Sequence, residues 1–361
     1  MIYVHVPFCR SFCTYCGFYS EIARGDCFEG FLSAIVAEAS ARKEEILKTL
    51  DVNTLYIGGG TPSVLPLSAM QRLLEALPQG PFSEFTMEAN PEDIVQKGKA
   101  YAMGLKELGV NRISLGMQSF DDGILHLMNR RHDSARAVEA FTLLRECGFD
   151  NISIDLIFGM DGLSDALWEE TLEKALALRP EHISAYQLSI EEGSALEELT
   201  ARGQYTEMAP EQCRRQYDML CAALSRGGYV HYEVSNFALP GHEAQHNSAY
   251  WSRVPYVGLG PGAHSFDGAK RSWNSRNPSG YTADYEILDD SQALEESIML
   301  GLRTARGIEA SLLEESTLQR ALDMGTLTVS GTGRVRIPEE RLFVSDDIIA
   351  DILLAAESKH L

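Results

Sequence analysis

Three cysteines near the amino terminus have the types and spacing to hold a metal centre. Cys9, Cys13 and Cys16 follow the pattern C-x3-C-x2-C and come directly after Tyr3–Phe8, whose near-alternating residues predict a strand. A proline before the loop and a glycine at its end disfavour a helix. Three thiolates suit an iron–sulfur cluster with three protein-bound irons and a fourth iron open to another ligand.

Other interpretations of these cysteines remain open. A structural zinc site needs a fourth nearby ligand, and His5 and Cys27, the local candidates, lack zinc-finger spacing. A disulfide or a buried cysteine cluster is the simpler structural alternative. The total of seven cysteines is odd, which argues against a disulfide framework and favours the reducing cytoplasm. The other four are scattered: Cys27, Cys147, Cys213 and Cys221.

Composition and charge narrow the class of protein. The 361 residues are 45% hydrophobic and 23% charged, as in ordinary globular proteins. We expect no signal peptide and no transmembrane segment, because no cationic leader or long apolar run is present. The formal charge of −21 argues against nucleic acid as a partner. One short basic group stands out, formed by Lys270, Arg271 and Arg276.

Up to about residue 190, short β-rich runs alternate with helical patterns. This order predicts an α/β protein with an open (β/α)6 partial TIM barrel, whose chemistry gathers at the carboxyl ends of the strands. The predicted strands are Ile2–Val6, Thr54–Ile57, Phe85–Glu88, Arg112–Gly116, Ile152–Phe158 and His182–Ser189. The predicted helices include Phe31–Leu50, Ser68–Leu77, Asp93–Leu108, Ala135–Cys147 and Asp165–Leu178. Residues 190 to about 235 are predicted to be helical, with a charged, solvated face.

Polar and glycine residues collect at the predicted strand ends. Gly58–Thr61 follows the second strand, and successive glycines let a ligand approach the main chain. Glu88 ends the third strand, Gln118 follows the fourth, and Asp155 interrupts the apolar fifth strand. A buried acid needs a cation or hydroxyl partner. Taken singly, each of these residues is more typical of a turn, a cap or a satisfied core group.

Taken together, the cysteine loop and the strand-end residues resemble the radical S-adenosylmethionine (SAM) superfamily. The narrower resemblance is to the family of oxygen-independent coproporphyrinogen III dehydrogenase (HemN) and the haem chaperone HemW. It implies a [4Fe–4S] cluster on the three cysteines, with SAM chelating the open iron and accepting an electron. The SAM-contacting positions implied by the resemblance are Tyr3, Tyr15, Gly59, Gly60, Thr61, Glu88, Gln118, Arg130 and Asp155, with Tyr186 a weaker candidate.

A second segment, His246-Asn247-Ser248-Ala249-Tyr250-Trp251, is aromatic-rich and prone to turns. Its composition alone favours a loop held onto the barrel by its aromatic side chains. The resemblance changes this interpretation, because His-Asn-x-x-Tyr-Trp is a signature of the chaperone branch, where it is linked to haem binding. It assigns His246, Tyr250 and Trp251 to a haem site. His264 follows a glycine-rich turn that fails as a dinucleotide motif, and is a minor candidate ligand.

The chain divides into a predicted barrel domain with a haem-side extension, 1–285, and a small domain, 286–361. The small domain reads as α+β and winged-helix-like, and its 15 acidic and 7 basic residues favour a lid over a DNA-binding module. Its predicted elements are the helices Ser291–Leu302, Glu309–Leu322 and Asp346–Ala356 and the strands Thr326–Val329, Val335–Ile337 and Leu342–Val344.

Within the family, three features favour the chaperone. Phe18 occupies the place of the dehydrogenase's fourth cysteine, the chain starts two residues before Tyr3, and the His246 motif is present. We therefore expect a cytoplasmic haem chaperone that binds the cluster, SAM and haem and delivers haem to an apo-haemoprotein client, with a homodimer among the expected assemblies. The alternative is oxidative decarboxylation of coproporphyrinogen III by a 5′-deoxyadenosyl radical. A third hypothesis, tRNA modification, lacks a basic surface.

Overall fold

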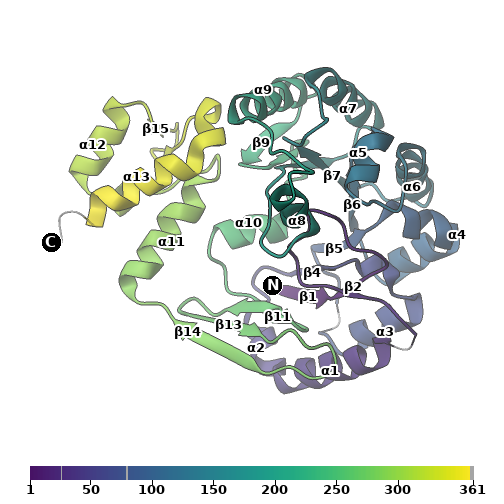
Figure 1. The fold of residues 1–361 in the computed structure, drawn as a ribbon. Coiled ribbons are helices and arrows are strands. Elements are labelled where there is room, and N and C mark those ends of the chain that lie inside the picture. Colours follow the sequence, from purple (N-terminus) through teal and green to yellow (C-terminus); the bar gives the residue numbers. More distant parts are fainter. Residues whose placement is uncertain (26, 79, 358–361) are drawn as a thin grey trace.

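In the part of the chain that the computed structural model describes, residues 1–25, 27–78 and 80–357, the core is a nine-stranded sheet. The sheet curves into an open barrel with strand order β11-β1-β4-β5-β6-β7-β8-β10-β9 (Figure 1). Its central strands run parallel in chain order, which confirms the predicted (β/α)6 core. They are β1 (Ile2–Val6), β4 (Thr54–Gly59), β5 (Glu84–Ala89), β6 (Arg112–Gln118), β7 (Ile152–Phe158) and β8 (His182–Gln187).

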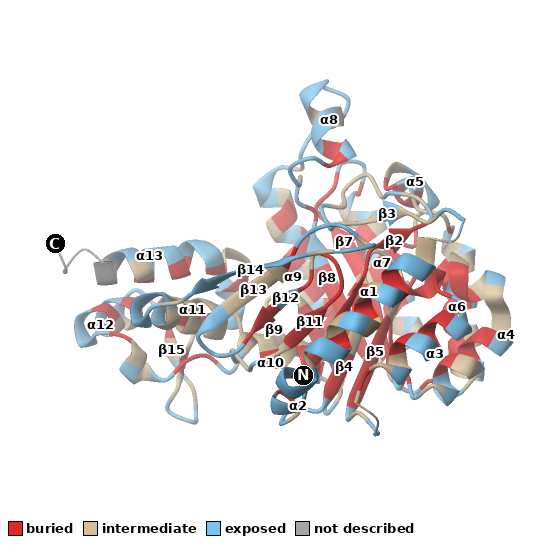
Figure 2. Cartoon of the chain, turned by 90° about the horizontal axis from the view of Figure 1, so that it is seen from below, coloured by how far each residue is buried: buried red, intermediate tan, exposed pale blue. Residues whose placement is uncertain are grey.

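Side chains alternate along these strands between an apolar outer face and a polar inner face. The outer residues pack beneath the connecting helices and form the hydrophobic core, which appears as the red strands in the middle of Figure 2. They include Ile2, Val4, Val6, Leu55, Ile57, Met87, Ile113, Leu115 and Ile154. The inner positions between them carry Tyr3, His5, Tyr56, Glu88, Arg112, Ser114, Asp155, His182 and Ser184. The barrel interior is therefore lined by polar side chains.

Several of the connecting helices begin at side-chain caps. Asn90 accepts a hydrogen bond from the Glu92 backbone at 3.0 Å, and Asp133 and Ser164 cap α6 and α7 in the same way. The helices are α1 (Cys27–Ala41), α2 (Lys43–Lys48), α3 (Leu67–Glu75), α4 (Pro91–Glu107), α5 (Asp122–Leu127), α6 (Ser134–Glu146), α7 (Asp165–Leu178), α8 (Ala195–Ala201) and α9 (Pro210–Arg226), with a 3-10 turn η1 (Pro62–Val64). The prediction of one continuous helix over Phe31–Leu50 is wrong, because the chain breaks at Arg42.

Both edges of the barrel carry short strands. Each has only three or four residues, too few for an alternating pattern of side chains to predict a strand from the sequence. β11 (Val257–Leu259) pairs parallel with β1. At the other edge β10 (Asn236–Ala238) pairs antiparallel with β8 and with β9 (Val230–Glu233). The helical prediction for 190–235 is therefore wrong at β9. Beyond β11, a small antiparallel sheet contains β12 (His264–Phe266), β13 (Lys270–Asn274) and β14 (Ala283–Ile287).

Glu38 on α1 anchors this small sheet. Its carboxylate accepts hydrogen bonds from the Gly260 backbone at 2.9 Å, from Asn274 Nδ2 at 2.9 Å and from the Tyr281 hydroxyl at 2.6 Å. Arg42 forms an ion pair with Glu38 at 3.0 Å and also donates to the Gly258 carbonyl. Such a charge-assisted network fixes the β11–β14 region against the barrel.

The carboxyl-terminal unit is small and mixed, as predicted. It holds α11 (Asp290–Leu302), η2 (Ala310–Leu312), α12 (Glu315–Asp323), the hairpin β15 (Thr328–Val329) and β16 (Val335–Arg336), η3 (Glu339–Val344) and α13 (Ser345–Glu357). The predicted strand Leu342–Val344 is wrong. It lies in the 3-10 helix η3, which begins directly after Pro338 and in which Arg341 donates to the Pro338 carbonyl. The proposed domain boundary at 285/286 falls within β14 and stays a prediction.

α11 spans the open side of the barrel, from β14 near one sheet edge to β9 at the other (Figure 1). At the far end, Val234 donates to the Arg303 carbonyl and Ala305 donates to the Tyr232 carbonyl, each at 3.0 Å. The open side of the barrel is therefore bordered by the small sheet and by this helix (Figure 1). Among the described residues, no helix has the length and apolar character needed to cross a membrane.

Candidate functional site

The cysteine loop leaves the barrel at the carboxyl end of β1. β2 (Phe8–Cys9) pairs parallel with β3 (Glu21–Ile22), so the loop between them is closed at its base. Glu21 donates to the Pro7 carbonyl at 2.6 Å, and Ala23 donates to the Cys9 carbonyl at 2.8 Å. The pairing agrees with the prediction that these residues form a loop and not a helix.

Contacts from distant segments hold the middle of this loop. The Thr14 backbone donates to the Met128 carbonyl at 3.2 Å, and Asn129 Nδ2 donates to the Phe12 carbonyl at 2.7 Å. Leu196, at the start of α8, donates to the Thr14 carbonyl at 2.8 Å. The cysteines are thus fixed over the strand ends by segments after β6 and β8.

Each cysteine has polar neighbours suited to a metal-bound thiolate. Cys9 Sγ lies 3.4 Å from Thr61 Oγ1, and Arg130 Nη1 donates to Cys13 Sγ at 3.2 Å. The pKa of the Cys16 thiol is raised to about 11, mainly by burial and to a smaller extent by Cys13 and Cys9. Burial also raises the pKa of Cys9, so without a metal the Cys9 and Cys16 thiols are protonated, whereas binding iron requires the thiolate.

The residues fit a cluster better than a single ion. In the described part of the chain, no three His, Cys, Asp or Glu side chains surround the position of one metal ion. In an iron–sulfur cluster each thiolate binds a different iron, so its sulfurs do not have to converge on one point. The seven cysteines are free, which excludes a cystine bridge in this loop.

Glu88 sits at the carboxyl end of β5 beside the glycine turn. Its carboxylate accepts the Tyr56 hydroxyl at 2.8 Å and the Gly59 backbone N–H at 3.0 Å. Burial raises its pKa to about 7, against the lowering effect of Tyr56 and with a further rise from Asp155. Gly60 is sterically required, because a Cβ there would lie 2.8 Å from the Phe8 carbonyl oxygen. The Glu88 carboxylate therefore already uses part of its hydrogen-bonding capacity on Tyr56 and on the glycine turn.

Gln118 and Arg130 meet at the end of β6. Gln118 has a positive φ of 68°, which is unfavourable for a side chain-bearing residue, and the pairing of β6 with β7 shifts register there. Arg130 Nη2 donates to the Gly116 carbonyl at 2.6 Å, while its buried Nε lacks a partner among the described residues. A buried, incompletely satisfied guanidinium at a strained strand end is suited to an anionic ligand group.

The remaining predicted SAM residues lie within electrostatic reach of these groups. Although burial lowers the pKa of Arg130, Tyr15, Cys13 and Asp155 raise it more, so it is held above its usual value. Burial raises the pKa of Asp155, and Ser114 donates to its carboxylate at 3.2 Å. Tyr3 donates to or accepts from His5 Nδ1 at 3.0 Å. The structure thus brings the cysteine loop together with Gly59, Thr61, Glu88, Gln118 and Arg130 at one mouth of the barrel, with Tyr3 and Asp155 deeper along their strands.

From the sequence alone, several inner-face residues near this site are not assigned to the SAM pocket. His5 bridges Tyr3 and the Tyr19 carbonyl, each at 3.0 Å, and Tyr56 holds Glu88. Arg112 is buried on β6, where Nη1 donates to Thr86 at 3.4 Å and Nε lacks a partner among the described residues. All three occupy alternate polar positions within predicted strands, a signal that was available in the sequence.

The predicted haem segment forms a short helix, α10 (Gln245–Trp251), and not a loop. His246 is fully buried, with Nδ1 2.9 Å from Thr54 Oγ1 and Nε2 3.1 Å from the Tyr250 hydroxyl. Glu84 accepts hydrogen bonds from the backbone of residues 245 and 246. Tyr250 packs edge-on against Tyr256, and Trp251 is half-buried.

This segment lies at the opposite end of the barrel from the cysteine loop. Thr54 and Glu84 are the first residues of β4 and β5, whereas Gly59, Thr61 and Glu88 stand at the carboxyl ends. Four to five residue intervals along these strands separate the two levels by about 13–16 Å. Both ring nitrogens of His246 are occupied, so iron ligation requires one hydrogen bond to open. Haem ligation by His246 stays a prediction.

Comparisons with known proteins agree with this geometry. A family model described as the radical SAM superfamily matches residues 3–175. The chain is 33% identical to the heme chaperone HemW of Bacillus subtilis, over 89% of this chain and 87% of that protein. It is also 33% identical to the heme chaperone HemW of Synechocystis sp., over 92% of this chain and 85% of that protein.

A solved structure shares the fold. Coproporphyrinogen III oxidase (HemN) from Escherichia coli, titled a radical SAM enzyme, superposes with a TM-score of 0.79 at 20% identity, covering 97% of this chain and 88% of that chain. At this identity the likeness concerns the fold. The relatives at 33% identity show family membership, because they align along most of both chains. The chain therefore belongs to the radical SAM superfamily and, within it, to the HemW family.

Proposed function

We propose that this protein is a haem chaperone, which binds a [4Fe–4S] cluster, SAM and haem and transfers haem to an apo-haemoprotein client. The observation that carries the proposal is the 33% identity to HemW proteins along nearly the whole chain. Membership in the radical SAM superfamily implies the cluster and SAM. Haem as cargo is inferred from these relatives, which are heme chaperones.

We assign the cluster to Cys9, Cys13 and Cys16. When bound, it supplies an open iron for SAM and an electron. The hydrogen bond from Arg130 to Cys13 Sγ supports this assignment, because a guanidinium stabilises a thiolate. The closed base of the loop supports it too, since a cluster needs ligands on a fixed scaffold.

SAM is assigned to the mouth beside the loop. Arg130, with its unpaired Nε, suits the methionyl carboxylate, and Glu88 and Asp155 suit hydroxyl groups of the ribose. The glycine turn at Gly59 and Gly60 offers close approach to main-chain groups, with Thr61 beside Cys9. Tyr3, Tyr15 and Gln118 complete the proposed pocket.

The alternative function is coproporphyrinogen oxidation. It is considered because the chain shares its fold with HemN. Phe18 weighs against it, because the fourth cysteine expected of the dehydrogenase is replaced by a phenylalanine that is 75% exposed. An apolar side chain so exposed beside the cluster loop is better suited to contact a porphyrin or a client than to bind metal.

The test is a haem titration of the full chain after anaerobic reconstitution of the cluster. We expect saturable binding, and a loss of affinity in a His246→Ala/Tyr250→Phe double variant if that segment contacts haem. Unchanged binding in the double variant removes the segment from the haem site. Absence of haem binding by the unmodified chain would refute the proposed function.

A further inference from the structure

Most histidines of the described chain already use their ring nitrogens. His5, His182, His231 and His246 have partners on both nitrogens, and buried His132 has one on Nε2. His264, the first residue of β12, differs from these. Its side chain is exposed, and within residues 1–25, 27–78 and 80–357 neither ring nitrogen has a hydrogen-bond partner. A free imidazole lone pair is what haem iron requires.

An aromatic wall stands beside His264. Trp273 on β13 is its direct cross-strand partner, with ring centroids 6.1 Å apart and planes inclined by 31°. Asp284 on β14 lies opposite Trp273, so the three side chains share one face of the small sheet. A histidine next to a flat, half-buried indole offers both a metal ligand and a surface for a porphyrin.

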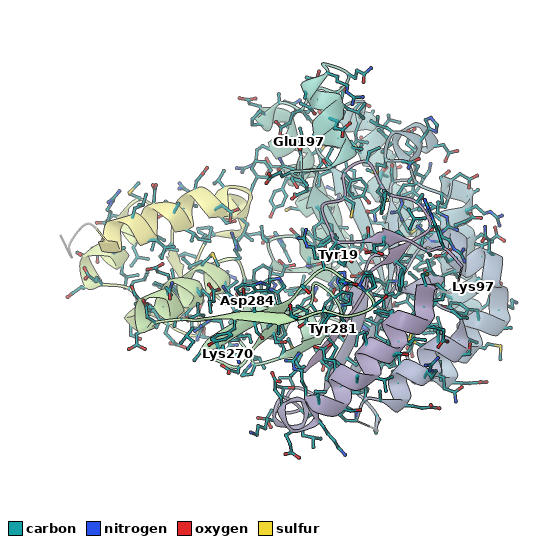
Figure 3. The ribbon with its side chains drawn as sticks, turned by 60° about the horizontal axis from the view of Figure 1, so that its bottom comes forward. Tyr19, Lys97, Glu197, Lys270, Tyr281 and Asp284 are labelled. Carbon is teal, nitrogen blue, oxygen red and sulfur yellow. The ribbon has the colours of Figure 1, made fainter. Side chains whose placement is uncertain are left out.

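This face is opposite to the one that packs on α1 and Arg42 through Ser265 and Asn274. A Cβ at Gly258 on β11 would collide with the carbonyl of His264, so the glycine lets β12 approach the barrel wall closely. Lys270 lies on the opposite face of the small sheet from Asp284 (Figure 3). The Arg276 guanidinium lies 5.8 Å from the Tyr19 ring centroid, and that ring stacks on His5. Because Tyr19 follows Cys16 by three residues, the face continues into the cluster loop.

The charges on this face suit a ligand with carboxylates at one end. Arg276 is exposed and has no ion-pair partner among the residues described, in contrast to Arg271, which pairs with Glu286 and Glu296. In a chain with a net charge of −21, an unpaired arginine is a local attraction for an anion. Asp284 and Glu286 repel carboxylates from the β14 side, so propionates would point toward Arg276.

The protonation state agrees with metal binding. Partial burial, with Arg271 and Arg276 next in effect, lowers the pKa of His264 against the opposing influence of Glu286. The imidazole is therefore neutral at pH 7, and its lone pair is available.

We propose that His264 is an axial ligand of haem iron, with Trp273 flanking the porphyrin and Arg276 binding a propionate. The inference rests on the proposed haem-chaperone function and names the surface that holds the cargo. His264 needs no rearrangement, whereas His246 is enclosed by Thr54 and Tyr250 at the amino ends of the strands. One haem on this face lies beside the cluster loop.

The test is a haem titration of the reconstituted full chain, followed by the Soret band and by electron paramagnetic resonance. His264→Ala should shift the Soret band, change the iron spin state and weaken binding by about tenfold or more, equivalent to roughly 1.4 kcal/mol. Added imidazole should restore the spectrum of this variant. Trp273→Ala should weaken binding without changing the ligand signature. The control is His126→Ala, at an exposed histidine on α5.

The outcomes separate the two proposals. If the unmodified chain binds haem and His264→Ala leaves both the spectrum and the affinity unchanged, the inference is overturned while the chaperone function stands. A ligand change in His246→Ala, with none in His264→Ala, overturns it as well. If the unmodified chain does not bind haem, the proposed function itself fails.

Discussion

We predict that the buried Glu88 carboxylate lowers the stability of the folded chain and contributes to SAM binding. The Glu88→Gln variant should reveal both effects. Burial raises the pKa of this carboxyl from 4.5 to about 7, so the folded chain holds the proton more tightly than the unfolded chain. The stabilising contribution of the group is complete below pH 4.5 and is lost as the pH rises to about 7. At about 1.4 kcal/mol per pH unit, the loss is at most about 3 kcal/mol, and about 1–2 kcal/mol after allowing for the residual exposure of the site.

Glutamine does not titrate, so the variant should lack this pH dependence. The informative quantity is the difference in unfolding free energy between pH 5 and pH 8, because hydrogen bonds that glutamine gains or loses cancel in that difference. Denaturant unfolding of the apo chain should show a fall with pH that is about 1–2 kcal/mol smaller in Glu88→Gln than in the unmodified protein.

Two further variants serve as controls for this prediction. Glu233→Gln should remove a similar pH dependence, since Glu233 is 1% exposed and burial raises its pKa to about 7. Glu107→Gln, at an exposed position at the end of α4, should change nothing. SAM affinity of Glu88→Gln should fall by roughly fivefold or more, as expected for a charged hydrogen bond replaced by a neutral one. An unchanged pH dependence in Glu88→Gln would refute the buried-carboxylate reasoning.

The other predictions concern the cluster, the glycine turn and the small sheet. Cys13→Ala should abolish iron and sulfide incorporation, measured by elemental analysis after reconstitution, whereas Cys147→Ala should retain both. Gly60→Ala should cost about 1–3 kcal/mol and weaken SAM binding in a titration, because its Cβ would press on the strand before the loop, while Gly280→Ala has free space and should be neutral. Glu38→Ala should destabilise the chain by about 3 kcal/mol in denaturant unfolding, since three donors and a cation lose their partner, and a smaller cost than 1 kcal/mol would contradict the anchoring role.

The barrel could be predicted because its strands combine alternation with helices of ordinary length between them. Val257–Leu259 and His264–Phe266 could not, since three-residue strands carry no periodic signal and their pairing is decided by tertiary contacts such as those of Glu38. The run Leu342–Val344 looked like a strand by composition, and the proline before its segment favoured a 3-10 helix.

For the site, the sequence indicates which residue types take part, but it does not predict which residues they contact. The sequence indicates that Glu88 needs a partner, but Tyr56, its hydroxyl donor, lies 32 positions away. The unusual backbone of Gln118 arises from the shifted pairing of β6 with β7, which no local pattern encodes. His246 had the chemistry of a ligand, but its burial depends on Thr54, 192 residues distant.

Transfer of haem to an acceptor protein distinguishes a haem chaperone from an enzyme of porphyrin synthesis. The reconstituted chain, loaded with one equivalent of haem, would be mixed with an apo-haemoprotein under anaerobic conditions with SAM present, and the acceptor separated and measured by its Soret absorbance. A chaperone should load the acceptor as the Soret band leaves the donor. If haem stays on the chain, while the same preparation converts coproporphyrinogen III to protoporphyrinogen with release of 5′-deoxyadenosine, the protein is an enzyme of porphyrin synthesis and the account given above is wrong.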